Sequence, residues 1–595
     1  MNLTPDQKAV GKDNYYEALG VSRRDFMKEV VAAGAVTGAG LGAMYFNYGK
    51  VDNPLRVGVI GTGDEGQVLI GALNPDYVQV TAIADIRPYN IHRAFHGDWA
   101  SDTLIGIRTG LISKYKWSGE DEARKHVKVY DKDYHDLLND PNVEAVIIAL
   151  PLHLHAQCAI DAMKAGKHVL CEKLMAHNIA QCKVMGRFAE SNNLYLAIGH
   201  QRHYSILYDN AVNLLRWGLL GQIHHIRAQW HRGNLPGKDS WQQPLPGGEM
   251  NSSGKKVDRI KSELTKWERE LAEEEDPSRA RTLEKKVAQW RAWMLDANVK
   301  AEDYGYQAFQ LGKGTRSALE ELCRWRLWER TGGGLMAELG SHQLDAASIF
   351  CSALRKDGKK AHPLTVHAVG GRHIFPLDRH AEDHVYCMFE FPGPDYDPSF
   401  PVGYYDDISG LPDKEKGVAG YVQDPNKKII VTYSSINGNG FGGYGEVVMG
   451  TRGTLVLERE QDVMLYKDAD TSSRVSVKND KGGPTMDTQS SGGPQAATAK
   501  AAQESGPVSK GYTEEIEHWA YAIRNKAPRE SLRCRAEVAM GDAIIALTSN
   551  IAINKSIKGE AGWVKFDETW FDLASDATPD GSSVEKEYQK LVNGK

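Results

Sequence analysis

The segment Arg56-Val-Gly-Val-Ile-Gly61-Thr-Gly63-Asp-Glu-Gly66 decides the fold of this chain. An apolar, strand-like run leads directly into three glycines with the spacing G-x-G-x-x-G, and a helical pattern follows. Such glycines allow a tight turn, a close approach of a pyrophosphate to the backbone, and close packing of the helix on the strand. The segment therefore predicts the phosphate-binding turn of a dinucleotide fold, with cofactor contacts from Gly61, Thr62, Gly63, Asp64, Glu65 and Gly66.

The nucleotide preference depends on the end of the next strand-like run. Asp85 closes that run, nineteen residues beyond Gly66. A carboxylate at this position accepts hydrogen bonds from the ribose hydroxyls and repels a 2′-phosphate, which favours NAD. Arg87 follows two residues later, and a guanidinium can pair with a phosphate. NADP therefore remains an alternative cofactor. The alternative interpretation of the Gly61–Gly66 segment is a glycine-rich turn that binds no ligand.

Outward from this turn, apolar runs alternate with helical patterns up to about His200, which is typical of a parallel α/β sheet. The strand-like runs are 55–61, 78–85, 127–130, 145–150, 168–172 and 194–199. They predict a Rossmann dinucleotide-binding domain over residues 53–200.

Longer strand-like runs follow, and they predict a second, α+β domain over residues 201–595 with a mostly antiparallel open sheet. These runs are 223–230, 364–374, 383–391, 428–433 and 446–457. Within 250–300, apolar residues three and four apart predict a charged helical hairpin, interpreted as a solvated lid or partner surface. Residues 481–510 are rich in Gly, Ser, Ala, Gln and Thr and predict a disordered loop.

Residues 1–52 have the pattern of a twin-arginine export signal. Ser22-Arg23-Arg24-Asp25-Phe26-Met27-Lys28 precedes a charge-free run from Val30 to Gly49. The run is weakly apolar for a membrane span and has no convincing cleavage site, so removal and retention as an anchor both stay open. An ordinary amphipathic N-terminus is the alternative, and it leaves the charge-free run unexplained. The signal predicts a periplasmic or envelope location.

Composition excludes two classes of protein. The formal net charge of −6 leaves no basic excess, so nucleic acid is not an expected partner. The seven cysteines are odd in number and lack metal-type spacing, which argues against a disulfide framework.

A second group of polar residues has the character of a catalytic site. Glu172-Lys173 closes the fifth strand-like run, and ligands of open parallel sheets bind at the carboxyl ends of the strands. Glu338, His342 and Asp345 are spaced i, i+4 and i+7, which predicts one helix face. These three form either a site or a structural polar cluster; nothing else supplies ligands, so no metal is predicted. His200 and His203 follow the last strand-like run and either border the site or are structural.

As an ordered set, these motifs resemble the Gfo/Idh/MocA family, named for glucose–fructose oxidoreductase, inositol dehydrogenase and a rhizopine-catabolism protein. The matching parts are the Gly61–Gly66 turn, Pro151-x-x-x-His155, Gly166-Lys-His-Val-Leu-Cys-Glu-Lys173, Gly333-Gly334 with Glu338-x-x-x-His342-x-x-Asp345, and Arg524. They span about 55–564, excluding the two insertions. Two departures are Leu174, where the family usually has Pro, and Glu338, where it often has Asp.

The resemblance implies hydride transfer between a sugar-like carbon and a nicotinamide. It assigns Lys173 to positioning the hydroxyl and relaying its proton, and His342 to acid–base catalysis. Glu338, in the catalytic set, and Asp345 orient His342 or bind substrate hydroxyls. Leu150, Pro151, His155, Glu172 and Lys173 join the cofactor contacts. The implied partners are a sugar or polyol, the twin-arginine translocase and further copies of the chain, with membrane contact only through the N-terminal segment.

Three functions fit this pattern. The first is an exported NAD(P)-dependent oxidoreductase for a saccharide or polyol, with a tightly bound cofactor. The second is an NAD-dependent glycosidase that works by transient oxidation, elimination and re-reduction. The third is a non-catalytic homologue that binds a sugar or nucleotide.

Overall fold

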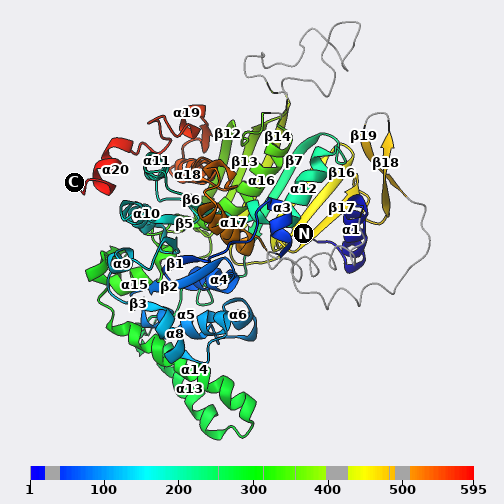
Figure 1. Ribbon diagram of the computed structural model, residues 1–595. Coiled ribbons are helices and arrows are strands. Elements are labelled where there is room, and N and C mark those ends of the chain that lie inside the picture. Colours follow the sequence, from blue (N-terminus) through cyan, green and yellow to red (C-terminus); the bar gives the residue numbers. More distant parts are fainter. Residues whose placement is uncertain are drawn as a thin grey trace, which may run out of the picture.

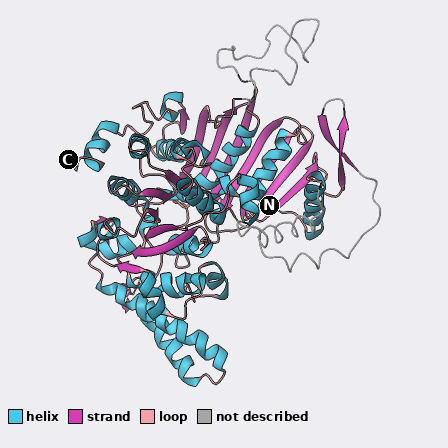
Figure 2. Ribbon diagram, viewed as in Figure 1, coloured by secondary structure: helices cyan, strands magenta, loops and turns pink. Residues whose placement is uncertain are grey.

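Two sheets organise the protein, a six-stranded one and an eight-stranded one (Figure 1). The computed structural model describes residues 2–20, 40–396 apart from 252, 313, 356 and 395, 427–480, 483–488 and 510–594. Helices cover both sheets, as Figure 2 shows by colour. The predicted fold class, a Rossmann domain followed by a domain with a mostly antiparallel sheet, is confirmed.

The first sheet is parallel throughout, with the order β3-β2-β1-β4-β5-β6. Its strands are β1 (Leu55–Ile60), β2 (Val78–Ala84), β3 (Lys128–Tyr130), β4 (Ala145–Ile148), β5 (His168–Glu172) and β6 (Leu196–Gly199). Its helices are α4 (Asp64–Ala72), α5 (Pro88–His96), α6 (Asp102–Ile107), α7 (Gly110–Tyr115), α8 (Glu120–His126), α9 (Tyr134–Leu138), α10 (His155–Lys164) and α11 (Ile179–Ser191). The strand order reverses between β1 and β4, so a crevice is expected at the carboxyl ends of these strands.

The second sheet has the order β17-β16-β15-β7-β14-β13-β12-β20, and only β7 and β14 pair in parallel. Its strands are β7 (Ile223–His231), β12 (Thr365–Gly371), β13 (His384–Pro392), β14 (Lys428–Ile436), β15 (Tyr444–Gly450), β16 (Gly453–Glu458), β17 (Asp462–Lys467) and β20 (Trp563–Lys565). The helices α12 (Ile206–Arg216), α16 (Ser341–Ala353) and α18 (Ala536–Ile557) pack on one face (Figure 1). The predicted run 446–457 is in fact two antiparallel strands, β15 and β16.

Smaller elements complete the second domain. They are β8 (Glu249–Met250), β9 (Lys256–Val257), β10 (Phe309–Leu311), β11 (Gly314–Arg316), α15 (Ala318–Cys323), α17 (Tyr512–Arg524), α19 (Glu568–Phe571) and α20 (Val584–Leu591). Among the described residues, α18 is the one helix whose length and composition would suit a membrane span, and 78% of its apolar window is buried inside the protein. All seven cysteines are buried and unbonded.

The charged insertion is a hairpin of two helices, as its periodicity predicts: α13 (Arg259–Glu273) and α14 (Pro277–Leu295). It projects from the Rossmann side of the molecule (Figure 1). Its base is docked, because Trp293 stacks on Tyr89 of α5 with ring centroids 4.4 Å apart. The insertion is therefore attached to the nucleotide-binding half.

The predicted disordered loop is wrong for six of its residues, which form β19 (Gly483–Thr488) beside β18 (Val475–Asp480). Local hairpin pairing overrides a composition that is poor in apolar residues. Residues 489–509 of that prediction lie outside the described residues.

The N-terminal region contributes two helices to the fold, α1 (Pro5–Ala18) and α3 (Gly40–Phe46). Helix α1 packs beside β17, where the Asn14 side-chain amide donates to the Leu465 carbonyl at 3.0 Å. After α3, the buried Tyr48 hydroxyl donates to Glu517 at 2.6 Å. The arginine pair at 23–24 lies outside the described residues, whereas the end of the charge-free run belongs to the packed protein.

Candidate active site

A cavity of about 790 Å³ runs between the two domains. The first domain contributes the phosphate-binding turn to its lining, and the second contributes residues from β7, η6 (Met336–Gly340) and α16. Of the predicted site residues, the cavity is lined by Gly61, Gly63, Asp64, Glu65, Asp85, Arg87, Leu150, Pro151, His155, Glu172, Lys173, Glu338 and His342. Thr62, Gly66 and Asp345 lie outside its lining.

The geometry of the turn fits a nucleotide. Gly61 has φ +86°, and a Cβ there would lie 2.4 Å from the Ala149 carbonyl oxygen. A Cβ on Gly66 would lie 2.2 Å from the Gly61 carbonyl oxygen, so the helix packs on the strand only with glycine. A Cβ on Gly63 would lie 3.8 Å from the Asn90 side chain, its nearest neighbour, so the space above Gly63 is open. This opening, at the N-terminus of α4, is where a pyrophosphate would be held.

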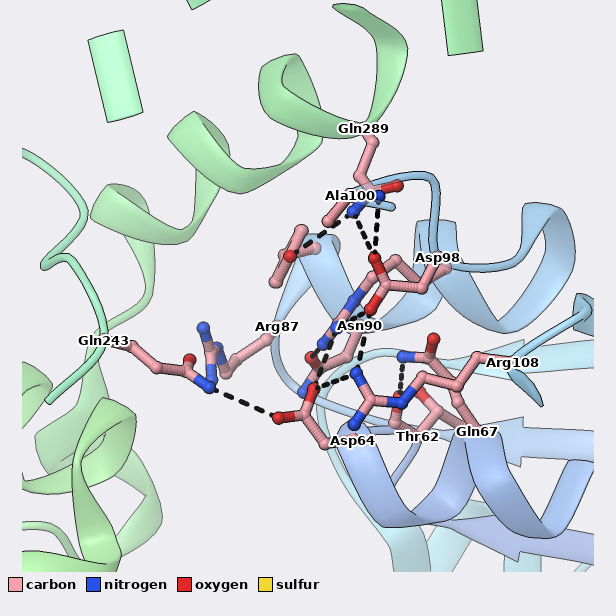
Figure 3. A network of polar contacts seen from close by, with 12 residues as sticks. Thr62, Asp64, Gln67, Arg87, Asn90, Asp98, Ala100, Arg108, Gln243 and Gln289 are labelled. Atoms are coloured by element: carbon pink, nitrogen blue, oxygen red, sulfur yellow. Dashed lines mark hydrogen bonds and ion pairs between the residues drawn. The ribbon is translucent and has the colours of Figure 1, made fainter. Parts of the chain in front are cut away.

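Two acidic residues sit in this turn, and their charges are compensated. Arg93 approaches the Asp64 carboxylate at 2.9 Å. Arg108 approaches it at 3.3 Å (Figure 3). Burial acts to raise the pKa of Asp64, but the two guanidinium groups hold it well below its usual value. Burial raises the pKa of Glu65, so the neutral acid is favoured there. An incoming pyrophosphate therefore meets less repulsion than the sequence suggests.

Asp85 lines the cavity with its carboxylate held by backbone N–H groups, and the Arg87 side chain is bound elsewhere. The Thr62 and Arg87 backbone N–H groups donate to the two oxygens of Asp85 at 2.8 and 2.9 Å. The Arg87 side chain instead donates to the buried Asp296 at 2.8 Å. Asp296 also accepts from the Tyr89 N–H at 3.0 Å. Sequence reasoning missed Asp296, because it lies more than two hundred residues from Arg87 and has no motif.

Lys173 and His342 both line the cavity. The Lys173 ammonium donates to the Glu338 carbonyl at 2.8 Å, and the Arg326 guanidinium pairs with the Glu338 carboxylate at 2.8 Å. The Lys173–Leu174 peptide bond is cis. The His342 ring lies 5.5 Å from the ring of Trp230. Burial and the positive charge of Lys173 hold the pKa of His342 well below its usual value, so the imidazole is neutral near pH 7.

The prediction that Glu338, His342 and Asp345 share one helix face needs correction. Glu338 lies in η6, a π-helical turn, and the α-helix begins only at Ser341. The change of helical period breaks the spacing argument. Asp345 is turned away from the cavity and accepts from His203 at 2.9 Å and Lys360 at 3.1 Å. We therefore assign Asp345 to support of the site rather than to substrate binding.

A buried polar cluster lies behind α16. Ligand atoms of His200, Asp345 and Asp542 lie within 4.8 Å of one another, a spacing that a metal ion would accept. Lys360, however, hydrogen-bonds both carboxylates. Burial and the charge of Asp345 raise the pKa of Asp542 well above its usual value. Burial acts to raise the pKa of Asp345 too, but His203 and Lys360 hold it well below its usual value. The Lys360 ammonium already supplies the positive charge that a metal ion would bring to the two carboxylates. We therefore assign the cluster a supporting role.

The remaining motif residues are also placed. The His155 ring lies 2.8 Å from the carbonyls of Leu150 and Leu174 and so joins the loops after β4 and β5. Burial and Glu65 raise the pKa of Glu172 well above its usual value. Arg524 pairs with Glu144 at 2.9 Å, and neither residue lines the cavity.

Known proteins resemble parts of the chain. Residues 55–200 match the model of the GFO_IDH_MocA family, described as an oxidoreductase family with an NAD-binding Rossmann fold. The inositol 2-dehydrogenase/D-chiro-inositol 3-dehydrogenase of Lactiplantibacillus plantarum is 28% identical over 170 residues, which cover 28% of this chain and 41% of that protein. A glycosyl hydrolase family 109 protein of Solibacter usitatus is 27% identical over 222 residues, which cover 35% of this chain and 46% of that protein.

The scyllo-inositol dehydrogenase of Lactobacillus casei, solved with NAD(H) and scyllo-inositol, is 14% identical with a TM-score of 0.44, covering 86% of this chain and 99% of that one. The chain spans less than half the length of the curated relatives it matches. Its first domain matches the NAD-binding Rossmann model of the GFO_IDH_MocA family over residues 55–200.

Proposed function

We propose that this protein is an NAD-dependent oxidoreductase that oxidises a hydroxyl-bearing carbon of a saccharide or polyol. The observation that carries the proposal is that Lys173 and His342 line the same cavity as the phosphate-binding turn. The inositol dehydrogenase relative supports the substrate class.

The chemistry follows from the protonation states at the site. A bound nicotinamide would supply the acceptor for the hydride that leaves the carbon. The neutral His342 is suited to take the hydroxyl proton, since its imidazole has a free lone pair. The Lys173 ammonium, held by the Glu338 carbonyl, positions the hydroxyl oxygen. Burial acts to raise the pKa of Glu338, but Arg326 and Lys173 lower it, so its carboxylate accepts a hydrogen bond from a second hydroxyl.

An NAD-dependent glycosidase is the second candidate, and the family 109 glycosyl hydrolase relative favours it. Such an enzyme would use the same oxidation first and the reverse reduction last. It would therefore cleave a glycoside without net formation of NADH. A homologue that binds ligands without turnover is the third candidate.

The test is to purify the protein without added nucleotide and to release any bound NAD(H) by denaturation. Native protein is then assayed with neutral and acidic sugars, polyols and aryl glycosides, with and without added NAD. We expect about one nucleotide per chain, and absorbance at 340 nm from reduction of that nucleotide by a sugar or polyol. Glycoside cleavage without net NADH would favour the glycosidase, and bound nucleotide without any reaction would favour the binding protein. Protein that is isolated empty and needs stoichiometric free NAD would contradict tight retention.

Export by the twin-arginine route is the second part of the proposal, supported by the sequence from Ser22 to Lys28. This route carries folded proteins, which suits a protein that leaves with its nucleotide bound. Because α1 and Tyr48 are packed into the protein, we propose that the N-terminal segment stays with the exported chain.

Replacing Arg23 and Arg24 with lysine is expected to leave folded protein in the cytoplasm, because the translocase reads the arginine pair as an address. The measurement is the distribution of the full-length chain between cytoplasm and envelope after cell fractionation. A variant in which Lys8 and Lys12 are changed to arginine is the matched control. Normal envelope amounts of the twin-lysine variant would contradict export by this route.

Association of copies is also proposed, through the open face of the second sheet. Large apolar side chains on β12, β13 and β20 remain 42–55% exposed there: Val369, Tyr386, Met388 and Trp563. The strand register places these four side chains beside one another on that face. An apolar patch of this kind is typical of an interface.

A further inference from the structure

One arginine in the cavity lining, Arg232, forms no ion pair with a carboxylate of the described residues. Arg232 follows β7, and its backbone N–H donates to the Ile436 carbonyl at 2.9 Å, which fixes the chain where β7 and β14 end. Its guanidinium lies 5.5 Å from the ring centroid of Trp230 and 5.9 Å from that of Trp241. All three residues line the cavity. Within the described part of the chain, no hydrogen bond or ion pair is made by this guanidinium.

The other cavity arginines are all matched with carboxylates. The pairs, at 2.8–3.3 Å, are Arg87–Asp296, Arg93–Asp64, Arg108–Asp64 and Arg326–Glu338. The acidic groups nearest Arg232 are already engaged, Glu338 by Arg326 and Asp239 by Arg379. Burial, together with repulsion from Arg326, lowers the pKa of Arg232. A half-buried cation without an anion costs free energy, and an anionic ligand would offset that cost.

The position of Arg232 assigns this anion to the substrate rather than to the nucleotide. Trp230, which stacks near Arg232, also contacts His342, the proposed base. Glu338, whose backbone carbonyl accepts from Lys173, also acts electrostatically on Arg232. Arg232 therefore lies in the part of the cavity where chemistry is expected.

The charge balance in this part of the cavity leads to the same conclusion. Lys173, Arg232 and Arg326 are positive. Among the described residues, Glu338 is the ionised acid acting on them that no cation outside this group holds, since Asp64 is paired with Arg93 and Asp239 with Arg379. Glu172 does not add a second negative charge, because burial raises its pKa. A neutral sugar would leave this excess uncompensated.

We propose that Arg232 binds a carboxylate of the substrate, so that the protein acts on acidic sugars such as hexuronates in preference to neutral sugars. This inference rests on the proposed oxidoreductase function and deepens it. A carboxylate matches the planar guanidinium through two parallel hydrogen bonds. A single unpaired arginine suits a monoanion better than a phosphate dianion, because Arg326 is already bound to Glu338. The indoles of Trp230 and Trp241 flank the guanidinium and limit its movement.

The test compares D-glucuronate, D-galacturonate and D-mannuronate with glucose, galactose and mannose, and with the three corresponding hexose 6-phosphates. Binding to the NAD-loaded protein is measured by calorimetric titration, and turnover is measured separately. The variants are Arg232→Met, which keeps the length of the side chain, and Arg232→Lys, which keeps its charge. Arg355→Met is the matched control, because Arg355 pairs with Asp357 outside the cavity.

We expect a hexuronate to bind at least 10-fold more tightly than its neutral counterpart. Arg232→Met should weaken uronate binding by about 10- to 100-fold, the range for a charged hydrogen bond, and change neutral-sugar binding little. Arg232→Lys should restore part of the difference. Equal binding of uronates and neutral sugars, or an unchanged preference in Arg232→Met, would overturn the proposal. Tighter binding of hexose phosphates would overturn the carboxylate assignment.

The binding measurement separates this inference from the proposed function. Uronate binding that depends on Arg232 but leads to no reaction would support the subsite and contradict the oxidoreductase. Oxidation of neutral sugars and uronates at equal rates and affinities would support the oxidoreductase and overturn the subsite. Failure of every uronate to bind at millimolar concentration would also overturn it.

Discussion

The Lys173→Ala variant is expected to turn over its substrate about 10²–10⁴-fold more slowly than the parent protein, the usual range for loss of an acid–base group. The ammonium proposed to hold the hydroxyl oxygen would be lost, while the glycine turn proposed to hold the pyrophosphate would be unchanged. A loss of the same order is expected for His342→Ala, because His155, the other cavity imidazole close to Lys173, has both ring nitrogens at backbone carbonyls, those of Leu174 and Leu150. Single-turnover rates of the NAD-loaded variants measure this, with nucleotide affinity as the second readout.

Conservative variants separate chemistry from packing. Lys173→Met keeps the length of the chain and should be as slow as Lys173→Ala. His362→Ala serves as the histidine control, because His362 stacks on Phe571 and does not line the cavity. Since the pKa of His342 is held well below 6.5, its neutral form should persist as the pH falls from 8 to 6.5, and the rate should not fall over that range through this group. Near-normal rates in both alanine variants would place the chemistry elsewhere.

The Asp85→Ala variant is expected to bind NAD about 10- to 100-fold more weakly, and NADP with a smaller loss. Loss of a charged hydrogen bond to the ribose costs about 1.5–3 kcal/mol, and loss of the carboxylate also relieves repulsion of a 2′-phosphate. Adding Asp296→Asn should raise NADP affinity above that of Asp85→Ala alone, because it releases the Arg87 guanidinium while the amide oxygen still accepts from the Tyr89 N–H. Calorimetric titration with both nucleotides measures the change.

Two further variants test the structural basis of this effect. Asp85→Asn keeps an acceptor for the Thr62 N–H, so it shows how much of the loss comes from a disturbed turn. Asp121→Asn, on the exposed side of α8, is the matched control for removal of a carboxylate. Unchanged NAD affinity in Asp85→Ala would remove Asp85 from the site, and unchanged NADP affinity in the double variant would show that Asp296 does not restrain Arg87.

The first domain could be predicted from the sequence strand by strand, because strands that are buried on both faces appear as continuous apolar runs. The run 168–172 agrees with β5 at both ends. In the second domain, 446–457 was one apolar run, although Gly450 and Gly453 bound the turn between β15 and β16. The parallel pairing of β7 with β14 joins segments about two hundred residues apart, and no local pattern specifies it.

For the site, the sequence located the residues but not their partners. Lys173 and His342 both face the cavity, as strand-end and helix positions suggested. Asp345 was misplaced because the argument assumed an α-helical period for a segment that begins with a π turn. Arg232 belongs to no motif, and its importance comes only from the folded structure, in which none of the described carboxylates forms an ion pair with it.

The docked base of the hairpin has a kinetic consequence. Separation of the two domains at the adenosine end would have to break the buried Arg87–Asp296 ion pair and unstack Trp293 from Tyr89. Neither of these two contacts involves Lys173 or His342, so a substrate of the proposed kind would exchange beside those residues without breaking them. The nucleotide would then have a residence time of many catalytic cycles. A protein of this kind would keep one bound nicotinamide nucleotide, which each substrate in turn would reduce or oxidise.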